Sequence, residues 1–201
     1  MNYNKTGYLF RRMILEIVKY GNPVLRAKGA RIEKINPEIK TLIADMFETM
    51  YAAAGVGLAA QQVGRPLQLT VIDVRGVKDR PSMLQLDGKP ADVAAYMPVV
   101  LINPEIRPFG EPDMGAEGCL SFPEVYSDIA RPDSVEVKAL NAEGQPVHFI
   151  AGGLLSRVVQ HETDHLNGIL FIDRMTSSAK AEVKGELETL QQQTKARLGN
   201  R

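Results

Sequence analysis

The sequence contains one cysteine and no tryptophan among its 201 residues, and aromatic residues make up only 6% of it. The single cysteine, Cys119, excludes an intrachain disulfide. Apolar runs stay short of the roughly 18 residues that a membrane-spanning helix needs, so we expect no membrane segment. An excess of either charge is also lacking, because 24 Lys and Arg balance 24 Asp and Glu. This balance gives no support to nucleic-acid binding through bulk charge, and we expect no direct DNA binding.

Length and composition indicate one folded domain. Hydrophobic residues make up 44% of the chain and charged residues 24%, as in typical globular proteins. Residues 1–12 (MNYNKTGYLFRR) carry three basic residues and no acid, and they are too poor in apolar residues for a secretory signal. We expect a disordered or non-native extension there, with a weak transit sequence as the alternative, and a single domain over residues 13–201.

Hydrophobic periodicity predicts a mixture of helices and strands. Asn36 and Pro37 are typical of an N-cap and a first helical residue, and apolar residues then recur at helical spacing as far as Ala54, with Gly55 as the stop. A last helix with one apolar face is expected from Ser178. The expected strands are 14–18, 67–74, 99–102, 134–140, 145–150 and 169–172; the fourth and fifth form a hairpin, and 76–98 is a surface loop.

Residues 154–168 (LLSRVVQHETDHLNG) hold the most specific pattern in the chain. His161 and His165 lie four positions apart, so on an α-helix they share one face, about one turn from each other. Both imidazoles can then reach one metal ion, and Glu162 lies beside that ion without binding it. The alternative is a polar amphipathic helix whose histidines satisfy local hydrogen bonds.

A catalytic metal site needs a third protein ligand and one open position. No histidine follows His165 in the sequence, and Glu182 falls in the solvated last helix, so Cys119 is the best candidate. Taken alone, a single cysteine is more often a small buried hydrophobic residue. The remaining histidine, His148, is expected to lie on the surface of a strand.

Such a site predicts amide hydrolysis. Metal-bound water attacks a carbonyl, and Glu162 accepts its proton and passes it to a leaving amine. The oxyanion needs further donors, for which the backbone N–H of Leu120 and the side-chain amide of Gln62 are candidates. Asp164 is left open between a residue that orients a ligand and an exposed helix residue. Residues 55–64 are rich in glycine and alanine but follow a helix, so context excludes a dinucleotide-binding loop and leaves a packing or a ligand contact.

Three stretches together resemble the motifs of peptide deformylases: GVGLAAQQ at 55–62, EGCLS at 117–121 and QHETDHLNG at 160–168. Their order and spacing fit, and GNPVLR at 21–26 is similar to the family's N-terminal motif. The resemblance implies removal of the N-formyl group from formyl-methionyl nascent polypeptides, with release of formate. It implies an α+β fold, with antiparallel β-sheets around a central metal-binding helix and with N- and C-terminal helices. It also implies a cytoplasmic bacterial enzyme, or an organellar one if residues 1–12 are a transit sequence.

Matching positions imply roles for single residues. The metal ligands are Cys119, His161 and His165, with ferrous iron as the native ion and zinc, nickel or cobalt as occupants in purified protein. The catalytic residues are Glu162 as acid and base, and Gln62 and Leu120 at the oxyanion. The substrate-binding residues are Val56, Gly57, Glu117, Leu154 and Val158, the last two on the wall of a methionine pocket. The ribosome surface near the exit tunnel is a further expected partner.

Several features depart from the family. The 76–98 loop is longer, residues 1–12 have no counterpart, Arg157 stands on the expected pocket rim where apolar residues are common, and Tyr126 stands where a basic residue is expected.

Two other functions stay open at this point. One is a zincin-like endopeptidase, which the cysteine ligand argues against. The other is a catalytically silent binding module with a structural metal, which has no need for Glu162 or Gln62.

Overall fold

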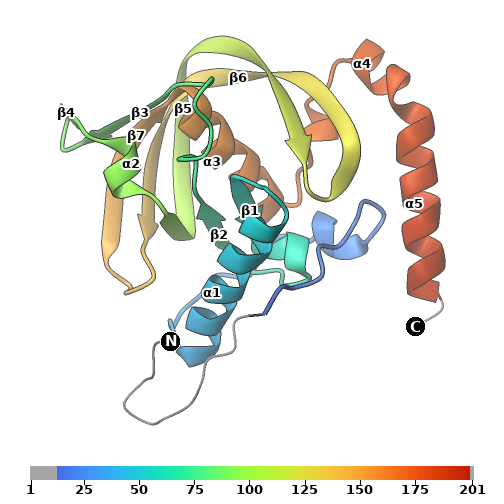
Figure 1. Cartoon of the computed structure of the whole chain (residues 1–201), viewed down its shortest axis with the longest axis horizontal. Helices are drawn as coiled ribbons and strands as arrows, with labels where there is room; N and C mark the ends of the chain where they lie inside the picture. Colours follow the sequence, from blue (N-terminus) through green and yellow to red (C-terminus); the bar gives the residue numbers. More distant parts are fainter. Residues whose placement is uncertain (1–12, 200–201) are drawn as a thin grey trace.

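An antiparallel sheet wraps around one buried helix, α3 (Gly153–Leu166), in the computed structural model of the chain (Figure 1). The structure describes residues 13–199, so the extension predicted over 1–12 lies outside the described residues. Helix α1 packs at one end of the sheet, and α5 runs along the outside of the molecule. This arrangement confirms the expected fold class, including the helices toward each end of the chain.

The elements follow one another along the described residues with few long connections. They are η1 Pro23–Arg26, α1 Pro37–Ala52, β1 Gly57–Ala59, η2 Ala60–Val63, β2 Leu69–Ile72, β3 Ser82–Leu86, β4 Lys89–Pro90, α2 Val93–Tyr96, β5 Val99–Cys119, β6 Phe122–Leu140, β7 Pro146–Gly152, α3, η3 Phe171–Asp173, α4 Ser177–Glu182 and α5 Lys184–Gly199, where η marks a 3-10 helix.

The seven strands in the described part of the chain are ordered β1-β2-β5-β6-β7-β3-β4, and every neighbouring pair is antiparallel. The centre is the long β5–β6 hairpin, which ends at Cys119 and Phe122. The prediction that a strand ends at Asn103-Pro104 was wrong, because β5 continues beyond these residues. The strand passes them through a register shift, at which Asn103 adopts a φ of 53°. The hairpin of β6 and β7 around residues 141–145 is confirmed.

Helix α1 confirms the strongest local prediction. The Asn36 side chain accepts the backbone N–H of Ile39, Pro37 opens the helix, and the buried side of α1 includes Met46 and Met50. The helix ends at Ala52, three residues before the predicted stop at Gly55, because Ala54 itself takes a left-handed φ of 53°.

Other predictions from local pattern were wrong. Residues 76–98 form β3, β4 and α2 in addition to loops, and β3 extends the sheet by pairing with β7. Residues 14–18 are extended but belong to no strand, and 169–172 enter the short 3-10 helix η3. The last helix is split in two, with Thr176 instead of Ser178 capping the first part. The β3–β7 pairing and the Thr176 cap depend on residues that a short local pattern does not include.

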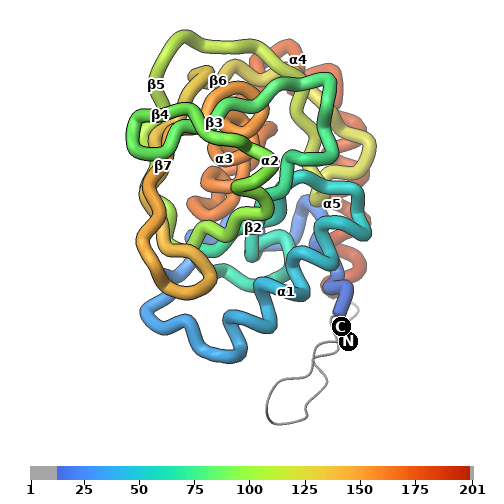
Figure 2. The backbone as a smooth tube through the Cα atoms, turned by 60° about the vertical axis from the view of Figure 1, so that its left-hand side comes forward, coloured from blue at the N-terminus to red at the C-terminus, as the bar shows by residue number. Residues whose placement is uncertain are grey.

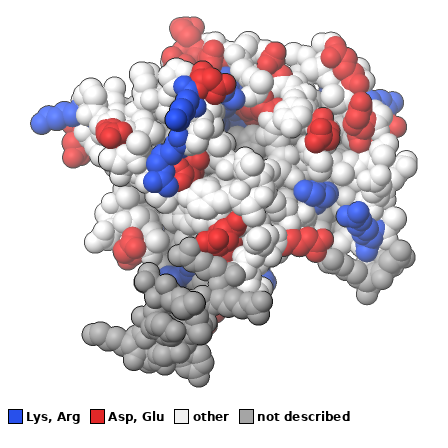
Figure 3. All heavy atoms as spheres, in the orientation of Figure 1, with Lys and Arg blue, Asp and Glu red and all other residues white. Residues whose placement is uncertain are grey.

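The described residues contain no helix that is both long and apolar enough to cross a membrane. Acidic and basic side chains are interspersed over the face in Figure 3, and no field of one sign covers its described atoms. The tube in Figure 2 shows α3 enclosed between the sheet and the chain segments around it. Three apolar clusters form the core, and one of them includes Leu154, Leu155, Val158 and Val159 of α3.

Candidate metal centre

Helix α3 is buried from Leu154 to Leu166 although many of its residues are polar. A helix with polar residues on all sides is normally exposed, so each buried polar group needs a partner from elsewhere. Gln160 illustrates this, because its amide nitrogen donates to Pro132 O at 2.8 Å and to Ser156 Oγ at 3.0 Å. The helix is therefore held in the core by specific bonds in addition to apolar packing.

The end of β5 brings Cys119 to the two histidines of α3. One ligand atom each from Cys119, His161 and His165 lies within 4.8 Å of the others. Cys119 Sγ is 3.3 Å from His165 Nε2, and the centroids of the two imidazole rings are 5.0 Å apart. Residues 42 and 46 positions apart in the chain thus meet at one point, as the sequence predicted.

The chemistry of this donor set fits one divalent transition ion. His161 Nδ1 lies 2.9 Å from Glu117 Oε2, so the carboxylate accepts that ring N–H and leaves the other nitrogen for a metal. A thiolate with two imidazoles suits zinc or ferrous iron better than the hard ions Mg²⁺ and Ca²⁺. Within the described residues, no fourth Asp, Glu, His or Cys joins the cluster. A set of three protein ligands is typical of catalytic sites, because structural sites are closed by four.

Burial and hydrogen bonds set the charges around the cluster. Burial raises the pKa of Glu162 to about 7, and burial lowers the pKa of His165 well below its usual range. Burial acts to lower the pKa of His161, but its contacts with Cys119 and Glu117 raise that pKa overall. Burial also opposes ionisation of Glu117, yet hydrogen bonds from His161 and Arg131 outweigh it and hold the pKa of Glu117 well below the usual range.

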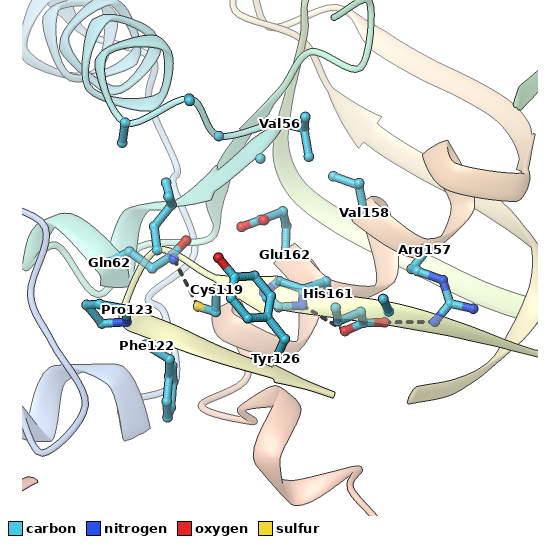
Figure 4. A pocket seen from close by; sticks show the side chains of 18 of the residues that line it. Val56, Gln62, Cys119, Phe122, Pro123, Tyr126, Arg157, Val158, His161 and Glu162 are labelled. Carbon is cyan, nitrogen blue, oxygen red and sulfur yellow. Dashed lines mark hydrogen bonds and ion pairs between the residues drawn. The ribbon is translucent and has the colours of Figure 1, made fainter. Parts of the chain in front are cut away.

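A pocket of about 600 Å³ opens onto this cluster (Figure 4). Glu162 lies between the apolar side chains of Val56 and Val158 on one side and Cys119 on the other. Gln62 Nε2 donates to Cys119 Sγ at 3.4 Å, and Gln62 Oε1 accepts the N–H of Ala59 at 2.8 Å. An amide nitrogen therefore points at the metal site and is fixed there by a backbone bond.

The structure brings together almost all of the residues predicted for the site. The pocket is lined by Val56, Gly57, Gln62, Glu117, Cys119, Leu120, Leu154, Val158, His161 and Glu162, and His165 lies beside it in the ligand cluster. The carboxylate of Glu117 is directed to Arg131, Arg157 and His161, and a substrate contact for this residue stays a prediction.

Two positions that depart from the family pattern lie in the pocket wall. Arg157 was expected on the rim, but its side chain is buried and bonded to the β5–β6 hairpin. Tyr126 is 65% exposed, and its ring covers Gly118, its cross-strand partner, where a Cβ would lie 2.6 Å from the ring. An aromatic ring therefore forms the outer wall where a basic side chain was expected.

Sequence reasoning missed three cations around the pocket. Arg131 bonds both oxygens of Glu117 and reaches Asp164 at 2.8 Å, which places Asp164 in a buried ion pair and away from solvent. Lys19 Nζ donates to Leu120 O at 2.7 Å, and burial lowers the pKa of this lysine. Arg80 donates to Ala116 O at 3.1 Å. The only signal in the sequence was indirect, since a buried carboxylate needs a cation.

Known protein families, sequences and structures match this chain over most of its length. The family model described as polypeptide deformylase matches residues 14–181. A peptide deformylase of Methylacidiphilum infernorum is 49% identical over 178 residues, which cover 89% of this chain and 93% of that protein. The crystal structure of Arabidopsis thaliana peptide deformylase 1B with an inhibitor aligns with a TM-score of 0.79 at 36% identity, over 92% of this chain and 94% of that one. The Thermotoga maritima peptide deformylase structure gives a TM-score of 0.69 at 39% identity, over 81% and 98%.

Proposed function

The chain belongs to the peptide deformylase family, and we propose that the residues around the middle of α3 carry out its reaction. The protein is a metal-dependent hydrolase that removes the N-formyl group from nascent polypeptides. The observation that carries the assignment of the site is the meeting of Cys119, His161 and His165 beside the buried carboxyl of Glu162.

The ligands in this proposal are Cys119, His161 and His165, and ferrous iron is the proposed native ion. When bound, the ion supplies an acidified water molecule and polarises the formyl carbonyl. The protein contributes the orientation of each donor, and the Glu117 carboxylate fixes the tautomer of His161 through its Nδ1. Zinc, nickel and cobalt fit the same donors, since affinity and cellular supply decide the occupant together.

Glu162 is the proposed acid and base. Its Oε2 is buried and has no hydrogen-bond partner among the described residues, so it is free to accept a proton from the attacking water. The same carboxyl then delivers that proton to the nitrogen of the departing methionyl amine. No group among the described residues has to be displaced from this oxygen before water can bind to it.

The remaining proposed roles concern positioning of the substrate. The Gln62 amide, which lies 3.4 Å from Cys119 Sγ, and the backbone N–H of Leu120, the next residue after Cys119, would donate to the oxyanion. Val56, directly before β1, and Gly57, the first residue of β1, would pair with the peptide backbone. Leu154 and Val158 lie one helical turn apart on α3 and would line a slot for the methionine side chain.

We further propose a cytoplasmic enzyme whose catalytic domain spans residues 13–201 and which acts near the ribosomal exit tunnel. The support is chemical, since nascent chains are the substrate and are available only as they emerge. Sedimentation of the purified protein with translating ribosomes checks the association, and a protein that stays in the supernatant contradicts it.

The decisive experiment loads the purified protein anaerobically with iron and measures formate released from a formyl-methionyl tripeptide. We expect formate release that is abolished by a chelator. An unformylated protein substrate serves as the control for the endopeptidase alternative and should stay intact. The proposed function is wrong if no formate appears with iron, nickel, cobalt or zinc.

A further inference from the structure

Arg157 is a buried arginine on α3 whose guanidinium contacts both strands of the β5–β6 hairpin. It is 5% exposed. From β5 it reaches Asp113 O at 2.7 Å and Gly115 O at 3.3 Å, and from β6 it reaches Ile129 O at 2.7 Å. All three of these contacts are made to backbone carbonyls, so the arginine fixes where the hairpin lies relative to the helix.

The same guanidinium also holds the carboxylate next to a proposed metal ligand. Arg157 Nη1 donates to Glu117 Oε1 at 3.0 Å, while His161 Nδ1 lies 2.9 Å from Glu117 Oε2. Arg157 and His161 are four residues apart and share one face of α3. One carboxylate therefore bridges two side chains that lie one helical turn apart. Arg131 also bonds this carboxylate, at 2.6 Å to Oε1 and 2.9 Å to Oε2.

The strand opposite Arg157 is adapted to it. Asp113, Gly115 and Glu117 are alternate residues of β5, so they present to the same face of the sheet. A Cβ at Gly115 would lie 2.9 Å from the central carbon of the Arg157 guanidinium. The guanidinium thus lies directly on the Gly115 backbone, two residues from Glu117 and four from Cys119. Displacement of Arg157 would loosen the segment of β5 that places Glu117 and Cys119 beside α3.

We propose that Arg157 is a positioning residue: it holds Glu117, and through Glu117 the His161 ring, in the orientation that turns Nε2 of that ring toward the ligand cluster. The inference rests on the proposed role of His161. It does not require Arg157 to touch the substrate. Loss of groups that orient metal ligands typically lowers activity or metal affinity about 10- to 100-fold.

The test compares Arg157→Met, Arg157→Lys and the control Arg107→Met. Arg107 is an arginine on the same hairpin, but it is exposed and pairs with Glu136 at 2.7 Å. Each protein is assayed with formyl-methionyl and formyl-glycyl peptides, because glycine places no side chain in the pocket. We expect kcat of Arg157→Met to fall about 10- to 100-fold for both peptides, while KM for the formyl-glycyl peptide stays unchanged. Arg157→Lys keeps the charge and should lose less, and Arg107→Met should match the wild type.

A spectroscopic measurement separates positioning from a general loss of structure. In the zinc-loaded, diamagnetic protein, the Nδ1–H of His161 should give an NMR signal typical of a ring proton held by a carboxylate. We expect Arg157→Met to shift or lose this signal, with the His148 signals unchanged. The proposal is overturned if the His161 signal is unaffected, or if the loss of kcat is confined to the formyl-methionyl peptide. If Arg157→Met fails to fold, Arg157→Lys is judged by the same two criteria. If the wild type releases no formate, the proposed function fails, and the NMR signal alone decides the role of Arg157.

Discussion

Gly57 lies so close to Glu162 that a Cβ at position 57 would stand 2.4 Å from the Oε1 atom of that carboxyl. Gly57 begins β1, and Glu162 lies in the middle of α3, so this contact joins two distant segments of the chain. The missing side chain is what allows the strand backbone to approach the proposed acid and base. The motif glycine therefore has a steric reason that is visible only in the folded protein.

Gly57→Ala should inactivate the enzyme without unfolding it. The new methyl group meets the end of a flexible side chain, which moves easily, but that side chain is the proposed proton carrier. A displacement of about 1 Å in a catalytic group can lower kcat about 100-fold. Steady-state kinetics and thermal unfolding measure the two effects. Gly76→Ala is the control, since nothing lies within 4 Å of a Cβ there, and equal activity of both variants would contradict the steric argument.

Glu162→Gln should lower kcat by about 10²- to 10⁴-fold, because the amide cannot carry a proton from water to the leaving amine. The substitution preserves the size of the side chain and leaves the three proposed ligands in place. Metal analysis of the purified variant should therefore match the wild type. A variant that keeps wild-type kcat would remove Glu162 from the mechanism.

Gln62→Glu and Gln62→Met separate two functions of one side chain. Both variants lose the amide N–H near Cys119, and we expect kcat to fall about 10²- to 10³-fold in each. Only Gln62→Glu keeps an oxygen for the buried N–H of Ala59. Denaturant unfolding should show that Gln62→Met is less stable by about 1–3 kcal/mol, the cost of leaving that group unpaired. Equal kcat in both variants and the wild type would exclude Gln62 as an oxyanion donor.

Removal of the metal should lower both activity and the unfolding temperature. An ion present at 100 times its dissociation constant stabilises the folded state by about 2.7 kcal/mol, and a chelator removes that contribution. Calorimetry with and without chelator measures the shift, and restored iron should reverse it. Cys119→Ala serves as the control, because loss of the thiolate should leave little metal to remove. An unfolding temperature that is the same with and without the chelator would argue against a bound ion.

Asp73 should contribute stability that depends on pH. Arg75 Nη2 lies 2.6 Å from Asp73 Oδ2, and the Tyr51 hydroxyl donates to the same oxygen at 2.7 Å. The Arg75 hydrogen bond lowers the pKa of Asp73, although burial opposes it. The contribution is therefore complete above the unfolded-state pKa of about 3.9 and is lost as the pH falls through the lower folded-state pKa.

Thermal unfolding of wild type and Asp73→Asn from pH 7 to pH 2 tests this dependence. The wild type should be more stable at pH 7, and the difference should shrink below about pH 4. The control is Glu188→Gln, which removes an exposed pair with Lys184 at 3.7 Å and should change little at any pH. A constant difference between wild type and Asp73→Asn down to pH 2 would contradict the ionic explanation.

Features that depend on neighbouring residues followed from the sequence alone. Helix α1 was predictable because an Asn36 cap, Pro37 and an apolar stripe act within a few turns. The turn at residues 141–145 and the spacing of His161 and His165 are local in the same sense. Cys119 was predicted as the third ligand by elimination, since the chain holds one cysteine and three histidines. The family motifs then indicated the reaction.

Only the tertiary structure decided which distant groups pair with the strands and contact the residues of the proposed site. Short apolar patterns did not reveal that β5 runs on to Cys119, that residues 82–86 join the sheet, or that residues 14–18 do not. Nothing local pairs Glu117 with Arg131 and Arg157, or sets Gly57 against Glu162. Strand pairing and buried ion pairs form between residues that lie far apart along the chain, and their partners are selected by the packing of the whole domain around α3.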